Sequence, residues 1–211
     1  MSGMDFDPSP KSVAVIEPET AKKPQTRPLS QPRLRWWPLL LGPAAMILVY
    51  LATILDLQQF VSRAPNENIA LLLVGISIAA YAAQTIAFRT EFHLFMTALC
   101  TAFFCREWHF PGTSKGIYVA LALLAVWAVR RRKPLENAIA GTPLNLWLVC
   151  TFATYFLSQL IARRAFRGIL PIEDQVNVPL EESVETVAHL MMIVTSIIAL
   201  KARRKTPQSA P

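Results

Sequence analysis

Long apolar runs alternate with short polar segments along most of the chain. The runs cover about residues 36–61, 68–88, 91–104, 114–129, 144–162 and 182–200. An apolar run of about 20 residues is long enough for a helix that crosses a bilayer, and such a helix satisfies its own backbone hydrogen bonds. The pattern therefore predicts an all-α, polytopic membrane bundle of six transmembrane helices within residues 36–201.

The third run is the shortest and leaves the number of crossings open. It reaches spanning length only if Glu91 and His93 lie at one membrane surface and Arg106 lies at the other. The alternative is a re-entrant segment, which gives five transmembrane helices and inverts the later ones. Between runs, residues 135–143 and 168–180 contain Gly or Pro and are predicted as irregular connections.

The two ends of the chain lack apolar runs. Residues 1–35 are polar and rich in proline, a composition that buries too little apolar surface to order itself. We expect a disordered cytoplasmic tail at residues 1–35 and a short cytoplasmic C-terminal tail at residues 202–211.

The composition of the chain indicates that its positive charge contacts a membrane and not nucleic acid. Hydrophobic residues make up 53% of the chain and charged residues 17%, whereas about a quarter of a soluble domain is charged. The net charge of +7 comes largely from basic residues at the ends of apolar runs, where they orient helices and contact anionic lipids. We therefore expect the lipid bilayer as the main partner and no nucleic acid.

The positions of Lys and Arg also predict the orientation. With six crossings, one side of the membrane carries the N-terminal tail, Arg89 and the basic runs at 130–133 and 201–205. The other side carries fewer basic residues: Arg63, Arg106, Lys115, Arg163, Arg164 and Arg167. Because cytoplasmic segments carry the excess of Lys and Arg, both termini are expected in the cytoplasm.

Two polar groups are predicted to meet near the outer membrane surface. At the end of the third run and the start of the fourth lie Arg106, Glu107, His109 and Lys115. At the start of the last run lie Glu182, Glu185 and His189. The spacings of three and four residues in the second group place its members on one face of a helix. Ionisable groups at membrane depth usually face the bundle interior and have partners.

One hypothesis is a metal-dependent hydrolase that acts on a lipid. His109, Glu185 and His189 would supply two imidazoles and a carboxylate, a ligand set that suits zinc or iron. Glu107 and Glu182 would be the catalytic carboxylates, with one serving as base for a metal-bound water. Arg106 and Lys115 would contact the anionic headgroup.

Two other classes of function remain open. In a structural network, Arg106 would pair with Glu182 or Glu185 and His109 would hydrogen-bond a loop carbonyl, because the bilayer offers charges no partner. A small transporter would need a polar path across the bundle. The only candidates for that path are sparse: Asp56, Gln84, Glu91 and His93.

The segment from Phe104 to Phe110, followed by Tyr118 and by Glu181-Glu182-x-x-Glu185, resembles a pattern of uncharacterised bacterial inner-membrane proteins. The resemblance implies a bacterial inner-membrane location and supplies no activity. The chain is also faintly similar to ceramidase-like membrane hydrolases, which hold zinc with histidines and an aspartate. It departs from their paired late histidines, since position 185 is Glu.

The sequence therefore predicts a multi-pass inner-membrane protein without an assigned activity. Its outer polar cluster would be structural, or would contact a lipid headgroup or an unidentified protein partner. The hydrolase and the transporter are the alternatives, and zinc or iron would be the cofactor of the hydrolase.

Overall fold

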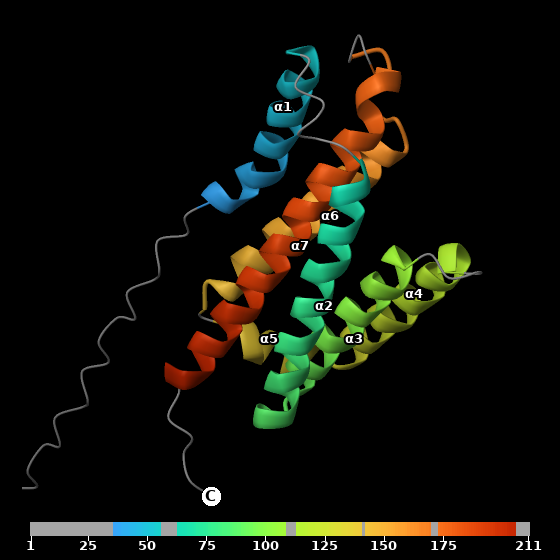
Figure 1. Ribbon diagram of the computed structural model, residues 1–211. Helices are drawn as coiled ribbons and strands as arrows, with labels where there is room; N and C mark the ends of the chain where they lie inside the picture. The colour runs from blue at the N-terminus through green and yellow to red at the C-terminus, as the bar shows by residue number, and fades with distance from the viewer. Residues whose placement is uncertain (1–35, 56–62, 109–112, 141, 170–172, 206–211) are drawn as a thin grey trace, which may run out of the picture. The chain divides into compact units, whose positions relative to one another are not determined.

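The protein is all-helical in the part of the chain that the structure describes. A computed structural model describes residues 36–55, 63–108, 113–140, 142–169 and 173–205. These residues contain no strand, which confirms the all-α prediction. The elements, shown in Figure 1, are η1 (Trp37–Leu40), α1 (Leu41–Ile54), α2 (Arg63–Phe88), α3 (Glu91–Glu107), α4 (Thr113–Arg130), α5 (Arg132–Ile139), α6 (Leu144–Ala162) and α7 (Glu173–Lys205). The predicted N-terminal tail lies outside the described residues.

Four of these helical segments are long and apolar enough to cross a membrane: Trp37–Ile54, Asn68–Phe88, Leu144–Ala162 and Val176–Arg203. α3 is not among them, because its 17 residues include Glu91, His93 and Arg106. The apolar part of α4, Gly116–Arg130, is also shorter. The structure thus supports a helical membrane protein, while six crossings remain a prediction.

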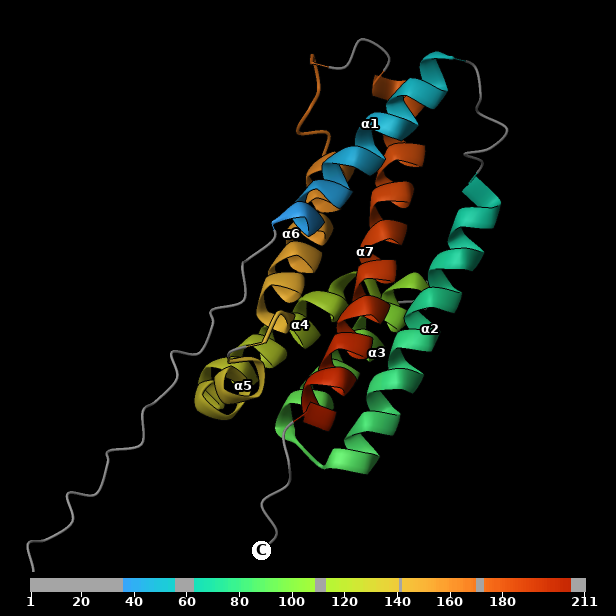
Figure 2. The same ribbon diagram turned by 90° about the vertical axis from the view of Figure 1, so that its left-hand side faces the viewer.

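α7 is the central helix. It packs against α1, α2 and α6, and Figure 2 shows it between α2 and α6. Val184, Ala188 and Met192 on α7 are fully or almost fully buried. Close packing of apolar side chains stabilises contacts between helices. These contacts hold α7 in a fixed position, and the polar side chains of the interior lie on it or next to it.

Two segments predicted as irregular are helical. Residues 173–180 belong to α7 in spite of Pro179, because Val176 and Leu180 are completely buried and hold the first turns of α7 against the bundle. Residues 135–139 belong to α5. Pro134 lies in the first turn of α5, where the missing N–H of a proline costs little. The predictions of irregular structure at these residues were therefore wrong.

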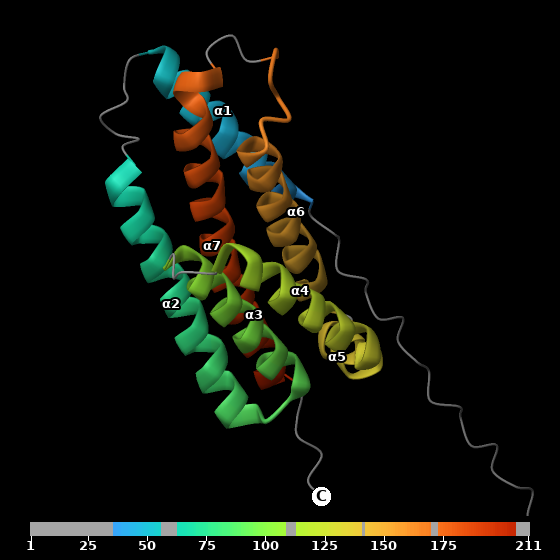
Figure 3. The same cartoon turned by 90° about the vertical axis from the view of Figure 1, so that its right-hand side faces the viewer.

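α3 and α4 form a hairpin whose two ends lie together. Figure 3 shows the two helices side by side, with α5 following α4. Glu91, at the start of α3, accepts from Arg131, just after α4, at 3.3 Å. The hairpin therefore begins and ends at the same end of the bundle, whether or not it crosses the membrane completely. The number of crossings, and with it the inversion expected for a re-entrant third run, stays a prediction.

Gly42 allows α1 to approach α6 closely. A Cβ atom added at Gly42 would lie 3.1 Å from both Cγ2 and Oγ1 of Thr154. Thr154 is buried, and its hydroxyl donates to the carbonyl oxygen of Cys150 at 2.9 Å. Rotation of Thr154 away from the new group would break that hydrogen bond.

We expect Gly42→Leu to destabilise the protein by about 1–3 kcal/mol, the usual cost of overpacking. The measurement is reversible unfolding in mixed micelles. Gly116→Leu is the matched control, because a Cβ at Gly116 meets nothing within 4 Å. Equal effects of the two substitutions would contradict close packing at Gly42.

Candidate functional site

Several polar side chains of α7 are buried at membrane depth. Glu185, His189, Thr195 and Ser196 are all buried. At 1.5 Å per residue, Glu185 lies about 14 Å and His189 about 20 Å along the helix from Val176, the start of the candidate span. Polar groups in hydrocarbon cost free energy when they lack partners, so we expect these side chains to contact polar groups of other helices.

Arg106 and Glu185 form a bidentate ion pair between α3 and α7. Nη1 of Arg106 donates to Oε1 of Glu185, and Nη2 donates to Oε2 at 3.3 Å. The carboxylate side is the more enclosed, with 8% of the Glu185 side chain exposed against 29% of Arg106. The geometry confirms the pairing of Arg106 with a carboxylate of the last helix, and it selects Glu185 from the two carboxylates considered.

His189 lies one turn further along α7 and contacts Tyr155 of α6. The Tyr155 hydroxyl and Nδ1 of His189 are 2.5 Å apart. The ring of Phe103 on α3 stacks against Tyr155 with centroids 4.6 Å apart. In the described part of the chain, Nε2 of His189 is buried and has no hydrogen-bond partner. If the tyrosine donates to Nδ1, the imidazole proton lies on Nε2.

Two further contacts join α7 to α2. The hydroxyls of Tyr81 and Thr195 are 2.8 Å apart, and Nε2 of Gln84 donates to the backbone oxygen of Ser196 at 3.1 Å. α7 therefore makes polar contacts with three helices in turn: with Arg106 of α3, with Tyr155 of α6, and with Tyr81 and Gln84 of α2. Interhelical hydrogen bonds of this kind fix the register of membrane helices.

A cavity of about 500 Å³ lies beside this network, between α3, α4 and α6. Its volume falls within the range of about 300–1,000 Å³ that is usual for ligand sites. The lining residues are Leu99, Phe103, Arg106, Ile117, Tyr118, Leu121, Phe152, Tyr155, Phe156, Gln159 and Arg163. Arg106 and Tyr155 thus belong both to the polar network and to the cavity wall.

The wall of the cavity changes from apolar to cationic in one direction. On α3 the lining residues run from Leu99 through Phe103 to Arg106. On α6 they run from Phe152 through Gln159 to Arg163. Helical residues three or four positions apart share a face, so each helix presents one continuous stripe to the cavity. The cationic ends of both stripes are C-terminal, near residues 106 and 163.

The cavity also has a wall of exposed aromatic side chains. Tyr118 of α4 and Phe156 of α6 are exposed on 60% and 66% of their surface, and Phe152 is also exposed. Exposed apolar residues on a membrane helix face the acyl chains. If α4 and α6 lie in a bilayer, this side of the cavity faces the acyl chains.

The predicted metal site is only partly within the described residues. Glu185 and His189 lie on one face of α7, as predicted, but Glu185 is paired with Arg106 and Nδ1 of His189 with Tyr155. His109 lies outside the described residues, as does the side chain of Lys115. Among the residues that the structure describes, no group of three His, Cys, Asp or Glu could hold a metal ion. A site that includes His109 stays a prediction.

The predicted catalytic carboxylates lie at the same end of the bundle as the ion pair. Glu107 is the last residue of α3 and Glu182 precedes Glu185 on α7. Both are half-buried. Their catalytic roles stay predictions.

Sequence reasoning did not identify Tyr81, Tyr155 or Thr195. The tyrosines lie in apolar runs, where an aromatic residue indicates only hydrophobic packing. The polar residues within the last apolar run were the signal that could have indicated such partners, because each buried polar group requires a hydrogen-bond partner.

Comparison with protein-family models, with curated proteins and with solved structures finds no match.

Proposed function

We propose that this protein is a bacterial inner-membrane protein that binds an anionic amphiphile in the cavity between α3, α4 and α6. The observation that carries the proposal is the placement of Arg106 and Arg163 at one end of a cavity whose other walls are mainly apolar. An acyl chain would occupy the part lined by Leu99, Leu121 and Phe152. An acidic headgroup would lie at the end with the two guanidinium groups.

The charges at the cationic end favour an anion. Arg106 uses two of its N–H groups on Glu185, and a guanidinium carries five, so further donors remain for a ligand. Its charge is balanced by Glu185, and the carboxylates of Glu107 and Glu181 also interact with it. The positive charge offered to a ligand is therefore that of Arg163 at the exposed end of α6. Arginine donates to planar and tetrahedral oxyanions in two-point geometry, which suits a carboxylate or phosphate headgroup.

The exposed aromatic wall favours a ligand that arrives from the bilayer. A water-soluble ligand would not need Phe152, Tyr118 and Phe156 at the membrane-facing entrance. An amphiphile could enter laterally, leaving its chain among these rings and placing its headgroup toward Arg163. Aromatic side chains of this kind are frequent in ligand sites and at membrane surfaces.

Native mass spectrometry with phosphatidylglycerol tests this proposal, with phosphatidylcholine as the zwitterionic comparison. We expect saturable binding of phosphatidylglycerol to the detergent-purified protein and weaker binding of phosphatidylcholine. Arg163→Gln should weaken the binding of phosphatidylglycerol about tenfold, the effect of one charge-assisted hydrogen bond. Leu121→Trp should reduce it by filling the apolar part of the cavity.

Arg167→Gln is the matched control, because it removes the same charge from an exposed residue that does not line the cavity. Binding that is unchanged in Arg163→Gln and Leu121→Trp would overturn the proposal. Equal losses in Arg163→Gln and Arg167→Gln would show attraction to the general surface charge instead.

The proposed orientation, with both termini in the cytoplasm, has a separate test. Arg63 begins α2, and residue 136 lies in α5 at the opposite end of the bundle, next to the start of α3. We expect single cysteines at positions 63 and 136 to be labelled from opposite sides of the membrane, with position 136 accessible from the cytoplasm. Labelling of both from one side would contradict the arrangement with four or six crossings.

A further inference from the structure

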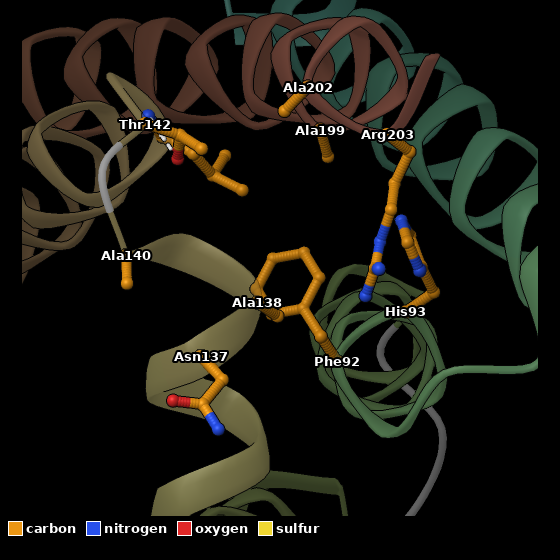
Figure 4. Close-up of a pocket in the computed structure, with 10 residues that line it drawn as sticks. Phe92, His93, Asn137, Ala138, Ala140, Thr142, Ala199, Ala202 and Arg203 are labelled. Atoms are coloured by element: carbon orange, nitrogen blue, oxygen red, sulfur yellow. Dashed lines mark hydrogen bonds between the residues drawn. The ribbon is translucent and has the colours of Figure 1, made fainter. Parts of the chain in front are cut away.

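A second cavity, of about 150 Å³, lies at the α5 end of the bundle, between α3, α5 and α7. Figure 4 shows its surroundings, with Ala140 and Thr142 on one side and His93 and Arg203 on the other. Alanines at positions 138, 140, 199 and 202 form much of the wall. Their short side chains explain why helices that meet here leave an open space.

The imidazole of His93 is buried and has an unused nitrogen. His93 is exposed on only 1% of its surface. Its Nδ1 lies 2.5 Å from the hydroxyl of Thr90, whereas Nε2 has no hydrogen-bond partner in the described residues. If the threonine hydroxyl donates to Nδ1, the ring proton lies on Nε2. Buried polar atoms are nearly always satisfied in proteins, so this nitrogen indicates a missing hydrogen-bond partner.

Arg203 brings a positive charge to the same cavity wall. Figure 4 shows its side chain beside the imidazole of His93. Arg203 is half-buried and has no carboxylate partner within the described part of the chain. Of the nearby carboxylates, Glu136 pairs with Arg132 and Glu91 pairs with Arg131 through Oε1, while Oε2 of Glu91 is buried without a hydrogen-bond partner in the described residues. In the tautomer with its proton on Nε2, the imidazole and the guanidinium are both donors without an acceptor, and an anion would satisfy both.

The remaining polar group on the other wall is already satisfied. The hydroxyl of Thr142 donates to the carbonyl of Ile139 at 2.8 Å and accepts from the N–H of Leu144 at 3.3 Å. The donors on the cavity wall are the guanidinium of Arg203, the amide of Asn137 at the rim and, in the tautomer that carries the proton there, Nε2 of His93. No carboxylate is among the described residues that line the cavity, so its side chains favour an oxyanion.

We infer that this cavity binds a phosphate group through His93 and Arg203. The small volume and the polar rim suit a tetrahedral oxyanion rather than an acyl chain. The group could be inorganic phosphate or the terminal phosphate of a membrane lipid, since the recognising chemistry is the same. The site is separate from the cavity lined by Arg163 and lies at the other end of α6, so the two proposals can fail independently.

Calorimetric titration of the detergent-purified full chain with inorganic phosphate tests whether the bound phosphate group is inorganic phosphate. A second titration uses phosphatidylcholine vesicles with and without phosphatidic acid, whose phosphate is terminal. We expect saturable binding of at least one of these probes. Arg203→Gln should weaken it about tenfold, because one charge-assisted interaction is lost.

Two additional variants separate loss of the site from loss of the fold. Ala202→Leu should reduce binding by filling the cavity while keeping both donors. His93→Gln keeps a hydrogen-bonding side chain and should bind more tightly than His93→Phe. The matched control is Arg132→Gln, which removes the same charge from an exposed residue of α5 that does not line the cavity.

The outcomes decide both the site and its ligand. Binding of inorganic phosphate that is lost in Arg203→Gln and kept in Arg132→Gln supports a soluble anion. Binding of phosphatidic acid alone, with the same sensitivity, supports a lipid phosphate. Absence of binding by both probes would overturn the inference. Equal weakening of binding by Arg203→Gln and Arg132→Gln would also overturn it, as would unchanged binding in both Arg203→Gln and Ala202→Leu.

Discussion

Arg106→Ala is expected to destabilise the protein by about 3–5 kcal/mol, the cost of removing one partner of a buried ion pair. The Glu185 carboxylate would lose both of its donors in a place where it is almost completely enclosed. Its remaining options are to bind a proton or to draw water into the bundle, and both cost free energy. Reversible unfolding in mixed micelles measures the change.

The double variant Arg106→Met with Glu185→Leu should recover most of that loss. An apolar pair of similar volume avoids burying charges and often matches the stability of the original ion pair. Glu136→Gln is the control for loss of a carboxylate in an ion pair, because Arg132 and Glu136 are exposed and such pairs contribute little. A double variant as unstable as Arg106→Ala would show that the ion pair itself is required.

His189→Ala is expected to destabilise the protein by about 3 kcal/mol, and added metal should not restore the loss. The substitution leaves a cavity at a residue with no exposed surface, and it removes the partner of the Tyr155 hydroxyl. Leu190→Ala is the control on the same helix, because Leu190 is exposed on 47% of its surface. Thermal unfolding with and without zinc or iron measures both effects.

The same variant tests the hydrolase hypothesis. If His189 ligates a metal, the purified protein should contain about one zinc or iron per chain, as in other metalloenzymes with a single site. His189→Ala should then remain folded and lose the metal, as measured by elemental mass spectrometry. A folded His189→Ala protein of unchanged stability would argue against the structural role assigned to the contact with Tyr155.

The general architecture could be predicted because it depends on local properties of the sequence. Apolar runs determine which segments are helical in a membrane, and the spacing of Glu185 and His189 places them on one face of α7. The need of Arg106 for a carboxylate also followed from its position between apolar runs. The choice between Glu182 and Glu185 did not follow, since it depends on the rotation of α7 against α3.

The partners of the interior network could not be predicted, because they come from distant helices. Tyr81 and Thr195 are 114 positions apart, and Tyr155 and His189 are 34 apart. Each tyrosine lies in an apolar run, where hydrophobic packing of the ring is sufficient to explain an aromatic residue. The cavity depends on how three helices diverge, a property that no single run contains. The helical start of α7 was missed because Pro179 suggested a break, whereas the burial of Val176 and Leu180 maintains the helix.

The contact between Arg106 and Glu185 has a consequence for biosynthesis. The two residues are 79 positions apart, and α7 is the last helix among the described residues. A ribosome therefore delivers the arginine to the membrane before its carboxylate has been made. During that interval the guanidinium must remain near water or headgroups, because an unpaired arginine is costly in hydrocarbon. We therefore expect the final packing of α3 to wait for α7, and a chain truncated before α7 to retain an arginine without its carboxylate partner.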